Sequence, residues 1–170
     1  MSIDGCEHTF KNLATNVLPA YMAQLRYQFE SPVPMSRLAR DRVGPATLAK
    51  ELERPGDFQG CYVLIGEGTP CYIGISRSVL SRLRQHVRGR SHCDASLAYR
   101  MACNGDNHNM RRAEAMKTEW FRKRFDKAQK RIQRMDAAFV EITNHLELHV
   151  FEAYAAMELK TAKWNTFRTH

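Results

Sequence analysis

The feature that most constrains this chain is an abrupt change of hydrophobic period within residues 60–90. Its first part, GCYVLI, is a short apolar run rich in β-forming residues, and CYIGI is a second such run after the turn-forming segment EGTP. Beyond these runs the period becomes helical, with Val79, Leu80, Leu83 and Val87 at the spacing of one helix face. The pattern predicts a β-hairpin with a loop of about four residues, followed directly by a helix.

The same stretch concentrates side chains suited to phosphate chemistry. Tyr62 and Tyr72 lie on the two predicted strands, and a hairpin can bring both phenols to one side. Arg82 follows Tyr72 by ten residues, and His86 follows Arg82 by one helical turn, so the last two share a helix face. Phosphodiester cleavage can use two phenols, a guanidinium and an imidazole to orient water and to offset phosphate charge.

At these residues the chain resembles the GIY-YIG nuclease superfamily. GCY at residues 60–62 stands where the first family motif has Gly-Ile-Tyr, and YIG at residues 72–74 matches the second motif. The spacing of ten residues between the tyrosines, and of ten more to the arginine, also fits the family. Cys61 is a conservative departure, because a free cysteine behaves as a small hydrophobe.

A second part of the resemblance lies towards the end of the chain. The run AAFVEI predicts a third strand over residues 137–142, and a helix is expected over 145–159. In GIY-YIG nucleases the helix after the third strand carries a metal-binding glutamate, and an asparagine lies shortly beyond it. Glu152 and Asn165 occupy those places in this sequence. The resemblance covers residues 57–90 and 136–168.

Together these patterns predict an α/β (α+β) fold with a small, largely antiparallel three-stranded sheet flanked by helices. Residues 1–56 are expected to form a helical N-terminal appendage. It would hold one helix running to Phe29, which Pro19 kinks or restarts, and another over 38–52. The nuclease domain is expected over 57–170, interrupted by a helical insertion.

The insertion, residues 91–135, carries much of the positive charge of the chain. Its predicted helix, or pair of helices, over 109–135 holds ten basic and three acidic side chains, against a net charge of +8 for the whole chain. So uneven a balance supports contact with a phosphate backbone as well as it supports an ordinary solvated helix face. The residues expected to contact DNA are Arg77, Arg84, Arg88, Lys123, Lys127 and Lys130.

The resemblance implies a DNA endonuclease in which these side chains have distinct roles. Tyr62 would act as the general base or orient the attacking water, helped by Tyr72 or His86. Arg82 would grip the scissile phosphate in the transition state. The alternative is structural: tyrosines that pack a sheet, one surface arginine among several, and a histidine on a helix surface.

The resemblance also implies the metal. Glu152 would be the single protein carboxylate that holds Mg²⁺, with Mn²⁺ able to substitute, because Mg²⁺ prefers oxygen ligands and keeps most of its waters. Asn165 would fix local backbone or phosphate geometry. The alternative for Glu152 is a solvent-facing glutamate of an ordinary helix.

Other properties limit the class of protein without identifying a pathway. No apolar run approaches the length of about 18 residues that a membrane span needs, and the N-terminal residues lack the features of a signal peptide. Five cysteines without a close pair suggest reduced thiols and a cytoplasmic protein. A non-catalytic DNA-binding module on the same scaffold is the alternative function. The choice between restriction, repair and mobile-element nucleases, and the oligomeric state, stay open.

Overall fold

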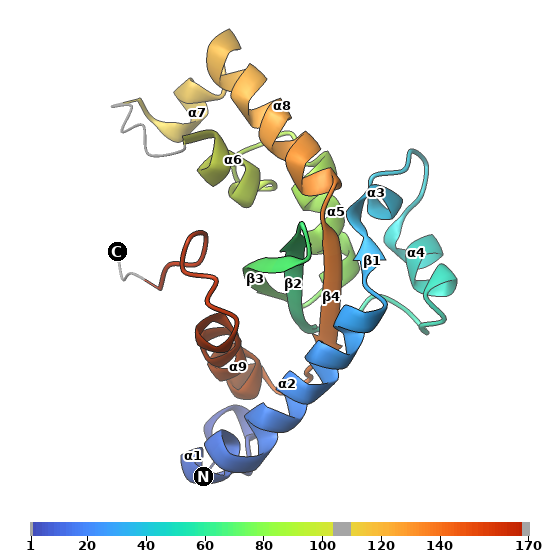
Figure 1. Cartoon of the computed structure of the whole chain (residues 1–170), viewed down its shortest axis with the longest axis vertical. Coiled ribbons are helices and arrows are strands. Elements are labelled where there is room, and N and C mark those ends of the chain that lie inside the picture. The colour runs from blue at the N-terminus through green and yellow to red at the C-terminus, as the bar shows by residue number, and fades with distance from the viewer. Residues whose placement is uncertain (1, 104–109, 168–170) are drawn as a thin grey trace. The chain divides into compact units, whose positions relative to one another are not determined.

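The structure is a computed structural model that describes residues 2–103 and 110–167 (Figure 1). The chain forms two compact units, and each is described by itself. The first unit comprises Met1–Val33, Asp57–Val79 and Asp136–His170, and the second comprises Pro34–Gly56 and Leu80–Met135. The N-terminal residues predicted to form a separate appendage are therefore divided between the two units.

A four-stranded antiparallel sheet with the strand order β1-β4-β2-β3 makes the fold α+β. The strands are β1 (Val33–Pro34), β2 (Gly60–Gly66), β3 (Thr69–Ser76) and β4 (Asp136–Glu141). The prediction of three strands was wrong by one, because β1 is too short to show any alternation of apolar and polar residues. Its proline is tolerated because β1 lies at the edge of the sheet.

The turn between β2 and β3 is tighter than predicted. It consists of Glu67 and Gly68, whose φ angles are 52° and 74°. Two residues with positive φ form a type I′ turn, whose twist matches that of the flanking strands. The expected loop of four residues was wrong because Thr69 and Pro70 already belong to β3.

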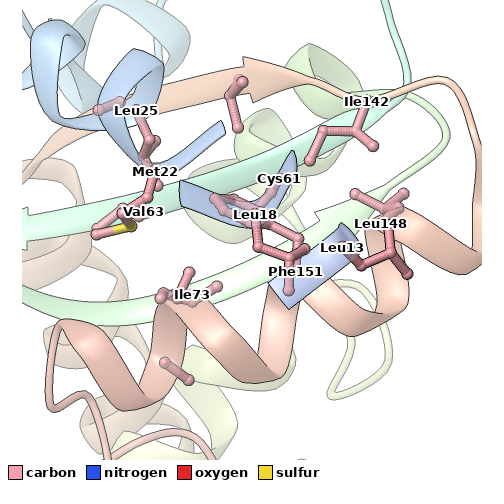
Figure 2. Close-up of a cluster of buried hydrophobic side chains, with 14 of the residues drawn as sticks. Leu13, Leu18, Met22, Leu25, Cys61, Val63, Ile73, Ile142, Leu148 and Phe151 are labelled. Atoms are coloured by element: carbon pink, nitrogen blue, oxygen red, sulfur yellow. The ribbon is translucent and has the colours of Figure 1, made fainter. Parts of the chain in front are cut away.

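One face of the sheet packs against α2 (Leu18–Tyr27) and α9 (His145–Glu158), as Figure 2 shows. Alternate residues of β2 point to this face, since successive side chains of a strand point to opposite sides. The labelled members of the buried cluster are Leu13, Leu18, Met22, Leu25, Cys61, Val63, Ile73, Ile142, Leu148 and Phe151. The cluster joins three distant parts of the sequence into the core of the first unit.

The N-terminal helix contains an irregular segment just before Pro19. After the 3₁₀ turn η1 (Ile3–Gly5), the helical elements are α1 (Phe10–Asn12), the π-helical segment η2 (Leu13–Val17), α2 and the 3₁₀ turn η3 (Gln28–Glu30). In a regular α-helix the Pro19 ring would collide with the carbonyl four residues earlier. The wider π turn relieves this collision, so the predicted interruption at Pro19 is confirmed.

The second unit is built from helices. They are α3 (Met35–Leu38), α4 (Pro45–Glu51), α5 (Val79–Arg88, whose first residue is assigned to the first unit), α6 (Ser96–Cys103), α7 (Arg112–Ala115) and α8 (Glu119–Gln133). The single helix predicted over 38–52 was wrong, because Gly44 and Pro45 start a separate helix there. The predicted helix or pair over 109–135 is the pair α7 and α8, while residue 109 lies outside the described residues.

A close aromatic contact joins α6 and α8. The rings of Tyr99 and Phe121 lie 5.1 Å apart between centroids. Within residues 2–103 and 110–167, no helix is long and apolar enough to cross a membrane.

Candidate active site

A β-bulge in the hairpin determines which way Tyr72 points. Close to the turn, Ile65 pairs with Pro70, and that register would place Cys71 opposite Leu64 if it continued. Instead the register shifts between Leu64 and Ile65, so that Leu64 pairs with Tyr72 and Cys71 is the extra residue. The Cys71 thiol donates to the Leu64 carbonyl at 3.3 Å. The bulge thus moves Tyr72 to the other face of the sheet.

Because of this shift, both tyrosines lie on the same face. Tyr62 and Leu64 are two residues apart on β2 and point the same way, and Tyr72 is paired with Leu64. The centroids of the Tyr62 and Tyr72 rings are 6.2 Å apart, and the rings are tilted by 53°. Both side chains are buried. The hairpin therefore brings the two phenols together, as expected from the sequence.

Gly74 provides the space in which the Tyr62 ring lies. Tyr62 pairs with Gly74 across the hairpin. A Cβ atom at residue 74 would be only 2.4 Å from the Tyr62 hydroxyl oxygen and 2.5 Å from its Cζ. Steric crowding thus explains why residue 74, the last residue of YIG, is glycine. Any side chain there would displace the phenol of Tyr62.

Asn165 is bound to the backbone of the YIG segment. Its Nδ2 donates to the Ile73 carbonyl at 2.7 Å, and its Oδ1 accepts from the Ile73 amide at 2.9 Å. The Asn165 amide therefore pairs with β3 as a neighbouring strand would. This pair of hydrogen bonds to Ile73, the residue between Tyr72 and Gly74, fixes the path of the strand that carries Tyr72 and Gly74.

Glu152 lies on α9 as a half-buried carboxylate. Burial raises its pKa above the ordinary value, and burial together with the Glu152 charge raises the pKa of the Cys61 thiol. Within the described residues Glu152 makes no ion pair and no side-chain hydrogen bond. A half-buried carboxylate without a cationic partner fits a bound cation, so the residue suits the Mg²⁺ that the family resemblance implies.

The tyrosines and α9 lie on opposite faces of the sheet. Cys61 and Ile73 belong to the core cluster that packs on α9, whereas Tyr62 and Tyr72 point the other way. α9 contacts β3, which is an edge strand. The sheet thus separates Glu152 from the two phenols, and Asn165 is bound to the same edge strand that α9 contacts.

Arg82 is half-buried in the second unit and is held by one residue each of α5, α6 and the segment between them. Its Nη1 donates to the Gln85 Oε1 at 3.0 Å and to the Asp94 carbonyl at 2.8 Å, and its Nη2 donates to the Ser96 hydroxyl at 2.8 Å. A guanidinium has five N–H donors, so Nε–H and a second Nη2–H have no partner within the described part of the chain. This side of the fork can bind a phosphate with two hydrogen bonds.

His86 is fully buried, so the alternative of a histidine on a helix surface was wrong. Burial lowers its pKa to about 3, and the positive charges of Arg82 and Arg100 contribute. The imidazole is therefore neutral at physiological pH.

The arginines expected to bind DNA differ in their surroundings. Arg77 is exposed. The Arg84 Nη1 donates to the carbonyls of Leu38 and Arg40, at 2.9 and 3.0 Å. Arg88 donates to the Ala39 carbonyl and forms an ion pair with Asp41 at 2.5 Å. Arg84 and Arg88 therefore hold the end of α3 in the second unit, and their contact with DNA stays a prediction.

The three predicted lysines of the insertion are exposed on α8. Lys123, Lys127 and Lys130 lie on the side of the helix opposite to the buried Phe121 and Phe125. Lys123 forms an ion pair with Glu119 at 2.7 Å, one turn earlier.

Two determinants of this geometry were missed in the sequence. The bulge at Cys71 could have been inferred, because a two-residue turn and an even separation of the tyrosines require one extra residue to place them on the same face. The contacts of Asp94 and Ser96 with Arg82 left no sequence pattern, since they depend on how the segment after α5 folds back.

A scan against protein-family models and searches of curated proteins and of solved structures found no match to this chain.

Proposed function

We propose that this protein is a metal-dependent endonuclease that hydrolyses DNA phosphodiester bonds with a site of the GIY-YIG type. The observation that carries the proposal is the bulged hairpin, which places Tyr62 and Tyr72 on one face. Gly74 makes room for the first phenol, and Asn165 fixes the strand of the second. A sheet that needed only apolar packing would have no use for this combination of constraints.

In the proposed mechanism a water molecule attacks the phosphorus in line with the leaving 3′ oxygen. A phenol is a weak base at neutral pH, so Tyr62 orients this water and Tyr72 assists. Arg82 uses its remaining N–H donors to offset the charge on the phosphate. Glu152 would hold Mg²⁺, which when bound stabilises charge on the phosphate and the leaving oxygen. The resemblance implies products with 5′-phosphate and 3′-hydroxyl ends.

His86 has no step in this mechanism. The imidazole is buried and neutral at physiological pH, so it adds no positive charge that could offset the charge of the phosphate. Its contribution is to the packing of α5, the helix that also carries Arg82.

A DNA substrate is supported by the charge of the protein. The net charge is +8, and exposed Lys123, Lys127 and Lys130 lie along one side of α8. Because these lysines are attracted to phosphates, they would bind DNA regardless of its base sequence. The free state of all five cysteines fits a cytoplasmic protein of this kind.

The test that separates the enzyme from a non-catalytic DNA-binding module is nicking of supercoiled plasmid. Purified protein should convert plasmid to the open circular form with Mg²⁺ or Mn²⁺, and a chelator should stop the reaction. Glu158→Gln is the matched control for Glu152→Gln, because Glu158 is an exposed glutamate of the same helix. DNA binding without any nicking would favour the binding module.

A further inference from the structure

A second line of side chains on α8 contains a tryptophan. Steps of four, three, four and three residues put its members on one side of the helix. The members are Trp120, Arg124, Lys127, Arg131 and, at the C-cap just beyond the last residue of α8, Arg134; they are called the Trp120 row below. With a rise of about 1.5 Å per residue the row is about 21 Å long.

The buried side of α8 lies about a third of a turn away from this row and fixes the direction in which the row points. Phe121, Phe125, Ala128 and Ile132 are buried, and Phe121 packs against α6. The helix therefore cannot turn about its axis without exposing two phenylalanines. The row is a fixed feature of the folded second unit.

The charge of the row is unbalanced. The acidic residues of α8 lie on other sides of the helix, where Glu119 pairs with Lys123 and Asp126 with Arg122. Within residues 110–167, no ion pair joins Lys127, Arg131 or Arg134 to a carboxylate. Such a line of cations complements the backbone of a nucleic acid.

Trp120 adds a group that phosphate binding does not require. Its side chain is 44% exposed, although tryptophan is highly buried on average. The Arg124 guanidinium lies 5.9 Å from the ring centroid, and Phe121 meets the ring edge-on at 5.5 Å. These contacts hold the indole at the start of the cationic row.

We propose that the Trp120 row binds a segment of unpaired DNA, with one base stacked on Trp120 and the phosphates that follow bound by Arg124, Lys127, Arg131 and Arg134. An indole can stack only on a base with an uncovered face. Inside a duplex the neighbouring base pairs cover both faces of each base, whereas the bases of a single strand can be reached. The inference deepens the proposed function, on which the choice of DNA rests. It names a substrate with a single-stranded segment, such as a flap, a branch or a strand end.

The test is binding to fluorescent oligonucleotides, measured by anisotropy in a chelator so that no cleavage occurs. The probes are a single strand, its blunt duplex and the same duplex with a single-stranded overhang. Trp120→Ala should weaken binding of the single strand and of the overhang about tenfold, as for other stacked bases, and leave the blunt duplex unchanged. Lys127→Ala should weaken binding to all three probes.

Two further variants separate stacking from folding. Trp120→Phe keeps an aromatic face and should retain most of the single-strand binding. Phe167→Ala removes another exposed aromatic residue, in the first unit, and should change nothing. Equal losses on single strand and duplex with Trp120→Ala, or no loss at all, would overturn the inference.

Plasmid nicking in parallel distinguishes this inference from the proposed function. Nicking without any dependence of single-strand binding on Trp120 would leave the nuclease and remove the unpaired-strand surface. Trp120-dependent binding without nicking would leave that surface and remove the nuclease.

Discussion

At the scale of single residues, Gly74 shows how closely the candidate site is packed. The Tyr62 phenol lies where a side chain of residue 74 would be, so Gly74→Ala must displace either the ring or the strand. We expect the free energy of unfolding to fall by about 1–3 kcal/mol, the usual cost of overpacking. Urea unfolding measures it. Gly56→Ala is the control, since nothing lies within 4 Å of a Cβ there, and equal losses would contradict the proposed packing.

His86 predicts a loss of stability in acid. Its pKa in the folded protein is about 3, below the ordinary value of about 6.5, so the unfolded chain binds the proton first. The stability that depends on neutral His86 is complete above about pH 6.5 and is lost as the pH falls towards 3. The free energy of unfolding, measured across this pH range, should depend less steeply on pH in the His86→Leu variant than in the wild type. The exposed His149→Gln should follow the wild type, and identical slopes for all three proteins would refute the prediction.

At the scale of elements, the bulge in β3 is expected to determine the face of the hairpin on which Tyr72 lies. Deletion of Cys71 would restore the register of the turn and send the Tyr72 side chain to the opposite face. NMR cross-peaks between the Tyr62 and Tyr72 rings should then disappear. Cys71→Ala keeps the number of residues and should retain these cross-peaks. Their survival in the deletion variant would show that something other than the bulge aligns the phenols.

The exposed lysines of α8 predict how DNA binding depends on salt. Changing Lys123, Lys127 and Lys130 to glutamine should weaken binding and reduce the slope of log K against log salt concentration by about 2–3. Titration of a duplex at several salt concentrations measures this slope. Changing Lys11, Lys50 and Lys160, which are exposed on other segments, should alter it less. An unchanged slope in the α8 variant would exclude these lysines as phosphate ligands.

The success of prediction also differed between elements. Alternation and helical period located β2, β3, β4, α5 and α9, because each has a long enough apolar pattern. The short strand β1 and the break before α4 depend on pairing and on local proline chemistry instead. For the candidate site, the sequence indicated that a hairpin can bring Tyr62 and Tyr72 to one side, but it did not show the bulge that does so. It could not predict that Arg82 is held by Asp94 and Ser96, because that contact crosses a loop.

At the scale of the whole molecule, the residues assigned to catalysis are divided between the two compact units. Tyr62, Tyr72, Glu152 and Asn165 belong to the first unit, and Arg82 belongs to the second. The first unit itself is assembled from three separated stretches of chain, so the sequence order gave no direct indication of this division. If the mechanism is right, removing one catalytic group from either unit should abolish the same reaction.

The most direct test of this claim is the rate of Mg²⁺-dependent plasmid nicking by the wild type, Arg82→Ala and Glu152→Ala, with DNA binding measured on the same preparations. We expect nicking by the wild type and a loss of about 10²-fold or more in each variant, with DNA binding largely retained. Wild-type rates in both variants would contradict the assigned site. Cleavage that persists in a chelator would contradict the role of the metal.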